Sequence, residues 1–110
     1  MKISELNVQG YERVLRGEDE AAGYLGFAFV HSTALGPAVG GTRYWSYSDE
    51  EAAIIDGLRL SRGMTYKNAL AELPCGGGKS IIMRRPGNEN REALFRAHGR
   101  LVEFLNRFGQ

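Results

Sequence analysis

The sequence predicts a mixed α/β protein in which helices pack on a small mixed β-sheet. Apolar runs typical of strands come first, helical patterns follow, and one further strand precedes the last helix. Strands and helices both bury an apolar face, so helices layered on a sheet account for this order. The 110 residues are enough for one domain with a real core.

The first half of the chain carries the strand signals. Residues 3–9 are predicted to form a short helix, and Glu12–Asp19, which alternates mildly, is predicted to be an edge strand. The long apolar and aromatic run Gly23–Thr33 predicts a buried strand. Turn residues open Leu35–Trp45, whose last four residues are typical of a strand.

Helical signals begin at Ser48. The segment from Ser48 to Glu51 matches a capping box in which Ser48 caps the helix. Gly63 is predicted to act as a stop or joint, and Pro74 to end a second helical segment over Met64–Leu73. The expected apolar face consists of Ala52, Ile55, Leu58 and, less regularly, Arg62.

A strand and a helix complete the chain. Ser80–Arg84 is predicted to be a short buried strand that follows a glycine-rich turn. The last helix has the most regular apolar spacing of any segment. Its predicted buried positions are Leu94, Ala97, Leu101, Leu105 and Phe108.

Bulk composition excludes several functions. The net charge is +1, from 14 basic and 13 acidic residues, and no basic stripe predicts nucleic-acid or membrane binding. The N-terminus, MKISELNVQG, has no apolar core of signal-peptide length, and no stretch approaches the roughly 20 apolar residues of a membrane span. The single cysteine, Cys75, excludes an internal disulfide and fits a cytoplasmic location. No cluster has metal-ligand spacing, and His31 and His98 are expected to be hydrogen-bonded structural residues.

The stretch CGGGKS, from Cys75 to Ser80, ends like a phosphate-binding loop but fails both nucleotide motifs. A Walker A loop needs a glycine where Leu73 stands, and a dinucleotide fingerprint needs one where Ile81 stands. Three glycines are more than a turn requires, so they indicate a backbone that passes close to another group.

Two lysines are candidates for chemistry. Lys79 follows the glycines at the end of a predicted sheet, and Lys67 lies on a helical segment, where a lysine is usually solvated. Together they predict a site for an anionic small molecule that contains a carbonyl group. One ammonium could hold a carboxylate, while the other, desolvated beside a cation, could have a lowered pKa and act as a base.

Three motifs appear in order between Tyr24 and Phe108: GPAVGGTR, MTYKNA and GGGK. In this respect the chain resembles the N-terminal, substrate-binding and dimerisation domain of the Glu/Leu/Phe/Val amino-acid dehydrogenases. The resemblance implies NAD-dependent oxidative deamination of an L-amino acid to a 2-oxo acid and ammonia. The choice between NAD and NADP stays open.

The resemblance also implies roles for individual residues. Lys67 would bind the α-carboxylate of the substrate, and Lys79 would be the catalytic lysine, which activates the water that attacks the imine carbon. Gly40 and Gly41 would bring backbone close to the substrate, and Met64 would lie nearby.

An apolar amino acid is the expected substrate. Glutamate-specific relatives carry a lysine before the Gly-Gly pair, whereas this chain has Val39. They also tend to place a glycine after the catalytic lysine, where this chain has Ser80. An acidic side chain that faced Val39 would lose its hydration without gaining a partner. The motifs do not separate leucine or valine from phenylalanine or tryptophan.

The chain departs from the family pattern in two ways. Residues 1–110 correspond to the substrate-binding and oligomerisation domain, whereas the catalytic aspartate and the dinucleotide-binding domain would follow it. The turn after the lysine strand reads MRRPGN in place of a GDP-like sequence. The isolated chain is therefore expected to bind no NAD and to be inactive.

Assembly and two alternative functions complete the expectations. We expect a homo-oligomer that uses the strands at Glu12–Arg16 and Gly23–Thr33. One alternative is a stand-alone binding or oligomerisation module without redox chemistry. The other is a phosphate-binding module, which depends on GGGKS alone.

Overall fold

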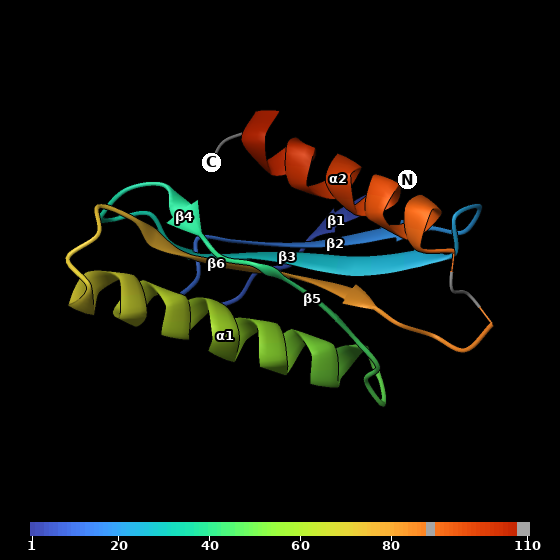
Figure 1. Ribbon diagram of the computed structural model, residues 1–110, viewed down its shortest axis with the longest axis horizontal. Helices are drawn as coiled ribbons and strands as arrows, with labels where there is room; N and C mark the ends of the chain where they lie inside the picture. The colour runs from blue at the N-terminus through green and yellow to red at the C-terminus, as the bar shows by residue number, and fades with distance from the viewer. Residues whose placement is uncertain (88–89, 108–110) are drawn as a thin grey trace.

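The computed structural model describes residues 1–87 and 90–107. A six-stranded mixed sheet carries one helix on each face, so the predicted fold class is confirmed (Figure 1). The elements, in chain order, are β1 (Lys2–Glu5), β2 (Arg13–Asp19), β3 (Tyr24–Ser32), β4 (Ala38–Val39), β5 (Thr42–Trp45), α1 (Glu50–Leu70), β6 (Gly76–Met83) and α2 (Arg91–Arg107). Neither helix in these ranges is long and apolar enough to cross a membrane.

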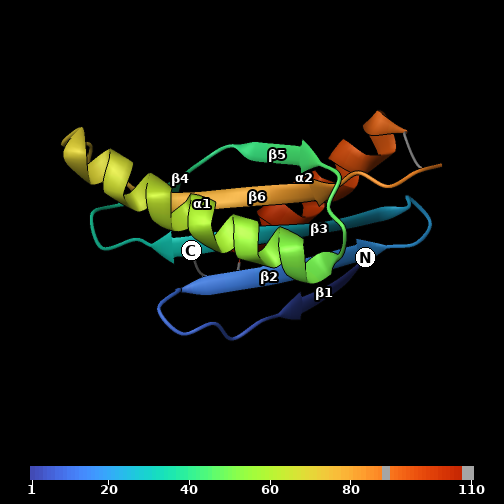
Figure 2. The same ribbon diagram turned by 90° about the horizontal axis from the view of Figure 1, so that it is seen from below.

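The sheet has an antiparallel half and a parallel edge. β1, β2, β3 and β6 lie side by side in that order, each antiparallel to its neighbour. β4 and β5 both run parallel to β6 along its other side (Figure 2). The two short strands therefore act as one interrupted edge strand.

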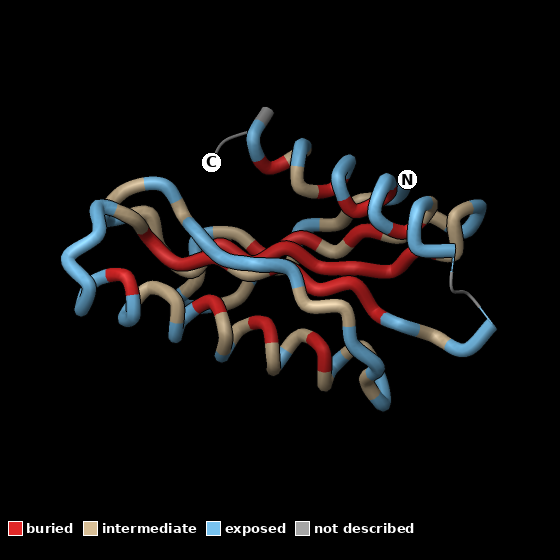
Figure 3. Tube along the Cα trace, in the orientation of Figure 1, coloured by how far each residue is buried: buried red, intermediate tan, exposed pale blue. Residues whose placement is uncertain are grey.

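The sheet lies between α1 on one face and α2 on the other, and its central strands β3 and β6 are mostly buried (Figures 1 and 3). The side chains of β3 alternate between two apolar cores, one under each helix. Those in the α2 core are Tyr24, Ala28 and Val30, and those in the α1 core are Leu25, Phe27 and Phe29. Because both faces are covered, the predicted strand Gly23–Thr33 is apolar at nearly every position instead of alternating with polar residues.

α1 is one continuous helix, so the predicted joint at Gly63 is wrong. The predicted cap is wrong by one position, because Asp49 is the N-cap and its carboxylate accepts a hydrogen bond from the Ala52 N–H at 2.8 Å. Gly63 is exposed inside the helix. An interior glycine costs only about 1 kcal/mol relative to alanine, which is too little to break a helix that packs along a sheet.

The predicted apolar face of α1 is also wrong, because Ile55 is 59% exposed. The buried positions are mostly small: Ala53, Gly57, Ser61 and Asn68. Close packing explains this choice, since a Cβ on Gly57 would lie only 2.0 Å from the Phe29 ring. Larger apolar residues such as Leu58 pack at the margin of the core.

The N-terminal segment differs from both expectations placed on it. Residues 3–9 do not form a helix, because Lys2–Glu5 is β1, which pairs with β2. β2 therefore lies inside the sheet and is not an edge strand. Four residues show too little periodicity for the sequence to distinguish a short strand from one helical turn.

The last helix follows its predicted pattern, but the last strand begins four residues before the predicted Ser80. β6 begins at Gly76, so the three glycines belong to the strand and not to a turn before it. Four predicted core positions of α2 are buried, namely Leu94, Ala97, Leu101 and Leu105. The fifth, Phe108, lies outside the described residues.

Candidate functional site

Four of the predicted site residues lie at or opposite the interruption between β4 and β5, namely Val39, Gly40, Gly41 and Lys79. Both strands keep the same register on β6, with Val39 opposite Gly77 and Thr42 opposite Ser80. Gly40 and Gly41 occupy the gap between them, and this register sets Gly41 opposite Lys79. The backbone N–H of Ser80 donates to the Gly41 carbonyl at 3.1 Å, which holds the gap against β6.

Gly40 and Gly41 have different surroundings. A Cβ on Gly40 would lie 1.6 Å from the Gly78 carbonyl oxygen, so only glycine fits there. A Cβ on Gly41 would meet one described group within 4 Å, the Lys79 ammonium nitrogen at 3.7 Å. The space beside Lys79 is therefore open.

The other glycines serve the packing of the protein itself. A Cβ on Gly76 would lie 1.7 Å from the Ser32 carbonyl oxygen, and one on Gly77 would lie 2.2 Å from the Thr65 backbone nitrogen. The close approach that the sequence predicts for these two is thus to strand β3 and helix α1. Their N–H and carbonyl groups take part in a sheet and do not form a phosphate-binding loop.

Lys79 points toward the α1 side of the sheet. It alternates along β6 with Ser80, whose hydroxyl bonds His98 on the α2 side, and its neighbour Ile81 lies in the α1 core. Val39 and Gly41 share the α1 side, because they pair with Gly77 and lie opposite Lys79. Val39 is 47% exposed and Lys79 is partly exposed.

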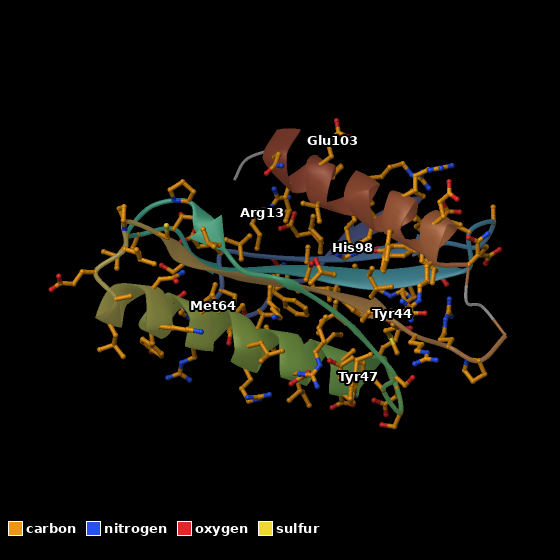
Figure 4. The ribbon with its side chains drawn as sticks, viewed as in Figure 1. Arg13, Tyr44, Tyr47, Met64, His98 and Glu103 are labelled. Carbon is orange, nitrogen blue, oxygen red and sulfur yellow. The ribbon has the colours of Figure 1, made fainter. Side chains whose placement is uncertain are left out.

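Lys67 lies on the side of α1 that faces the edge strand. Asp56, eleven residues earlier on α1, faces the edge strand, because it forms an ion pair with Arg43 of β5 at 3.6 Å. Eleven residues correspond to about three turns, so Lys67 has nearly the same direction from the helix axis. Met64, labelled in Figure 4, lies one turn before Lys67, between this side and the buried face. The fold thus brings Lys67, Met64 and Lys79 to one side of the sheet.

Asp56 anchors α1 to the edge strand. Its carboxylate accepts hydrogen bonds from the Tyr47 hydroxyl at 2.5 Å and from Arg59 at 2.8 Å. Burial alone would raise the pKa of Asp56, but these bonds and the charge of Arg43 lower it. The carboxylate therefore stays ionised and keeps its attraction for Arg43.

The two lysines are available to a ligand. Within residues 1–87 and 90–107, neither Lys67 nor Lys79 has an ion-pair partner. An ammonium group beside exposed Gly41, with a second lysine on the same side of the sheet, favours a small anion such as a carboxylate. The same part of the chain holds no group of three or more His, Cys, Asp or Glu side chains that could bind a metal ion.

On the α2 side of the sheet, behind the gap between β4 and β5, lies a group of residues that the sequence did not predict to interact. Thr42, Ser80, His98 and Tyr24 are linked by hydrogen bonds. A cavity of about 150 Å³ adjoins them, and its lining includes Gly40, Gly41, Lys79 and apolar residues of β3 and α2. His31, at the other end of β3, bonds the Thr65 hydroxyl at 2.8 Å. Both histidines are hydrogen-bonded as expected, but no local pattern predicts their partners.

Known proteins resemble this chain in sequence. Residues 8–110 match the family model described as Glu/Leu/Phe/Val dehydrogenase, dimerisation domain. Leucine dehydrogenase from Bacillus subtilis (strain 168) is 52% identical over 96 residues, which cover 87% of this chain and 26% of that protein. Valine dehydrogenase from Streptomyces virginiae is 50% identical over 96 residues, 87% of this chain and 27% of that protein.

Solved structures agree with the sequence comparisons. The crystal structure of L-tryptophan dehydrogenase from Nostoc punctiforme superposes with a TM-score of 0.81 and 48% identity, over 88% of this chain and 29% of that one. Glutamate dehydrogenase from Thermus thermophilus shares the fold, with a TM-score of 0.64 and 24% identity over 94% of this chain and 24% of that one. The chain spans about a quarter of the length of the curated relatives it matches.

Proposed function

Because the chain belongs to the Glu/Leu/Phe/Val dehydrogenase family through its dimerisation domain, we propose that it forms the substrate side of an L-amino-acid dehydrogenase. The reaction is oxidative deamination to a 2-oxo acid and ammonia. One observation carries this proposal. Lys79 is held in a buried strand with its ammonium beside the open space at Gly41, on the side of the sheet that also bears Lys67.

The positions of the two lysines suit them to different roles in the reaction. Lys67 is exposed on α1 and can turn toward a ligand, so it holds the α-carboxylate as a charge partner. Lys79 emerges from the middle of β6 and is less exposed, so its position is fixed by the sheet. Such a group is suited to proton transfer at the reacting carbon, where it activates the water that attacks the imine.

An apolar substrate fits the residue before the two glycines. Val39 lies on the same side of the sheet as Lys79 and presents an uncharged, half-exposed side chain. Relatives named leucine, valine and tryptophan dehydrogenases support the same preference. Ser80 does not contribute by contact, because its hydroxyl lies on the opposite side of the sheet, against His98.

NAD is the proposed hydride acceptor of the whole protein, but the described residues do not fit it. The glycine-rich run is a β-strand packed against Ser32 and Thr65, so it cannot wrap a pyrophosphate group. We therefore assign the dinucleotide to another part of the enzyme. The only cysteine, Cys75, is a free thiol, which agrees with the cytoplasmic location we propose.

Substitution of each lysine tests the proposal, in protein that joins this domain to a dinucleotide-binding domain. Lys79→Ala should lower kcat by about 10²–10⁴-fold, the range for a lost general acid or base. Lys67→Ala should mainly raise KM for the amino acid, because it removes a binding contact. Steady-state kinetics with leucine, phenylalanine and glutamate would measure both effects and the substrate preference.

The third lysine supplies a matched control. Lys2 lies on β1, at the opposite edge of the sheet, so Lys2→Ala should leave kcat and KM unchanged. Turnover within threefold of wild type in Lys79→Ala would refute the catalytic assignment. A preference for glutamate over leucine and phenylalanine would refute the apolar substrate.

A further inference from the structure

Four side chains from four elements form a hydrogen-bonded chain behind the proposed site, buried at three members and exposed at Thr42. Thr42 Oγ1 of β5 lies 2.8 Å from Ser80 Oγ of β6, and Ser80 Oγ lies 2.8 Å from His98 Nε2 of α2. His98 Nδ1 lies 2.6 Å from the Tyr24 hydroxyl of β3. Figure 4 shows His98 between α2 and the sheet.

Three of the four side chains are removed from water, and only Thr42, at the end of the chain, is exposed. Tyr24 is fully buried, and His98 and Ser80 are 5% and 8% exposed. Burial lowers the pKa of His98 to about 4, so the ring is neutral and offers one donor and one acceptor. The Tyr24 hydroxyl has no second acceptor among the described residues, so it donates to Nδ1, and Nε2–H donates to Ser80. The Ser80 hydroxyl is then left to donate to Thr42.

The chain ends at the backbone that carries the proposed site. Ser80 directly follows Lys79, and Thr42 directly follows Gly41. The Ser80–Thr42 bond is a second link beside the Ser80 N–H bond to the Gly41 carbonyl. The edge strand is thus fastened to β6 at the point where its own pairing is interrupted.

We propose that His98 is a positioning residue, which acts through Ser80 and Thr42 to fix the gap at Gly41 relative to the Lys79 ammonium. This inference rests on the proposed function of Lys79. None of the three side chains lies on the side of the sheet where Lys79 points, so they act by holding backbone and not by touching substrate. A displacement of about 1 Å at a reacting group is enough to cost roughly 10²-fold in rate.

Variants of Thr42 provide the most selective test, in protein that includes the dinucleotide-binding domain. Thr42→Val keeps the shape but removes the hydroxyl, whereas Thr42→Ser keeps the hydroxyl. Thr42→Val and Ser80→Ala should each lower kcat about tenfold with KM changed less than about threefold, and Thr42→Ser should restore most of the rate. The shape of the pH profile should not change, because Lys79 still carries the proton.

A second measurement does not depend on turnover. Hydrogen exchange of the β6 backbone, followed by mass spectrometry, should be about tenfold faster at the Ser80 amide in Thr42→Val, as expected for one weakened bond. Ser61→Ala is the control, because the one bond of its buried hydroxyl within the described part of the chain is to the Leu58 carbonyl of its own helix. It should change neither kcat nor the exchange of the Ser80 amide.

The outcomes separate this inference from the proposed function. Wild-type kcat in Thr42→Val, or unchanged exchange at Ser80, overturns the positioning role. A loss of melting temperature in Thr42→Val and Ser80→Ala with normal kcat below melting also overturns it, because that pattern indicates a structural role alone. A Lys79→Ala enzyme with normal kcat refutes the proposed function, whatever the exchange at Ser80.

Discussion

Gly40 and Gly41 are adjacent, but Gly40 is required by close packing whereas Gly41 borders open space. A side chain on Gly40 would collide with the Gly78 carbonyl oxygen, and one on Gly41 would meet described atoms only at the Lys79 ammonium, at ordinary contact distance. Gly40→Ala should therefore lower the free energy of unfolding by about 1–3 kcal/mol, the usual cost of overpacking. Gly41→Ala should fold normally and raise KM for the amino acid, because the methyl group occupies space that the proposed substrate needs.

Urea unfolding of the two variants would measure stability, and steady-state kinetics would measure binding. Each variant is the control for the other, because both add one methyl group and the positions are consecutive. Equal loss of stability in both variants would contradict the difference in their surroundings. Unchanged KM in Gly41→Ala would remove this glycine from the binding site.

At the level of single residues, the sequence predicts candidates better than it predicts contacts. Lys67 and Lys79 stand out by their setting and by the motifs around them, and the fold brings both to one side of the sheet. The bonds among Thr42, Ser80 and His98 could not be predicted, because they join β5, β6 and α2. A hydroxyl group looks the same in a sequence whether it faces water or a buried imidazole.

At the level of elements, two glycines of α1 give opposite predictions. Gly57 packs against Phe29, which is 1% exposed, so Gly57→Ala should destabilise the fold by about 1–3 kcal/mol. A methyl group on Gly63 would meet no described atom within 4 Å beyond the adjoining helix backbone, so Gly63→Ala should stabilise by about 0.5–1 kcal/mol through helix propensity. Thermal and urea unfolding would rank both variants against wild type. A stabilising Gly57→Ala would show that α1 does not lie against Phe29.

The contrast between the two helices explains which elements could be predicted. α2 buries Leu94, Ala97 and Leu101 at helical spacing, so its pattern is visible in the sequence. The buried face of α1 consists of small residues that lie against Phe29 and the glycines at the start of β6, where there is little room between helix and sheet. An apolar pattern cannot identify such a face, and the prediction therefore selected Ile55, which is exposed.

For the whole molecule, stability should fall in mild acid because of His98. Its pKa is about 4 when folded, against 6.5 for an exposed histidine. Between these values the unfolded chain binds a proton at His98 that the folded chain excludes. The free energy of unfolding is therefore unaffected by His98 above about pH 6.5 and decreases as the pH falls toward 4. From pH 7 to pH 5 the loss should be on the order of 2 kcal/mol.

Urea unfolding of wild type and His98→Gln at several pH values would test this dependence. The variant should show a flatter curve between pH 7 and pH 5. Burial also lowers the pKa of His31, so His31→Gln serves as the comparison that leaves the contribution of His98 in place. Parallel curves for wild type and His98→Gln would contradict the assignment.

Self-association stays a prediction, but the surface predicted to mediate it has to be revised. The predicted contact strands, Glu12–Arg16 and Gly23–Thr33, lie inside the sheet, whereas β1 is its antiparallel edge. Leu6 N–H donates to Val14 of β2 at 2.8 Å. By the alternation of an antiparallel ladder, the N–H groups of Ile3 and Glu5 point outward. Two copies could therefore pair their β1 edges about a two-fold axis.

Glu5→Pro removes one of these outward donors, and edge positions tolerate proline. The substitution also removes the salt bridge between Glu5 and Arg13, so Glu5→Ala is the matched control that loses the same salt bridge but keeps the N–H group. We expect wild type and Glu5→Ala to be dimers or larger, and Glu5→Pro to need at least about tenfold higher concentration to assemble, since one backbone hydrogen bond per copy is lost. Light scattering across a concentration series measures this. Equal assembly of all three would move the interface away from β1, to a surface such as the one around exposed Phe95. A strictly monomeric wild type would contradict self-association of this chain altogether.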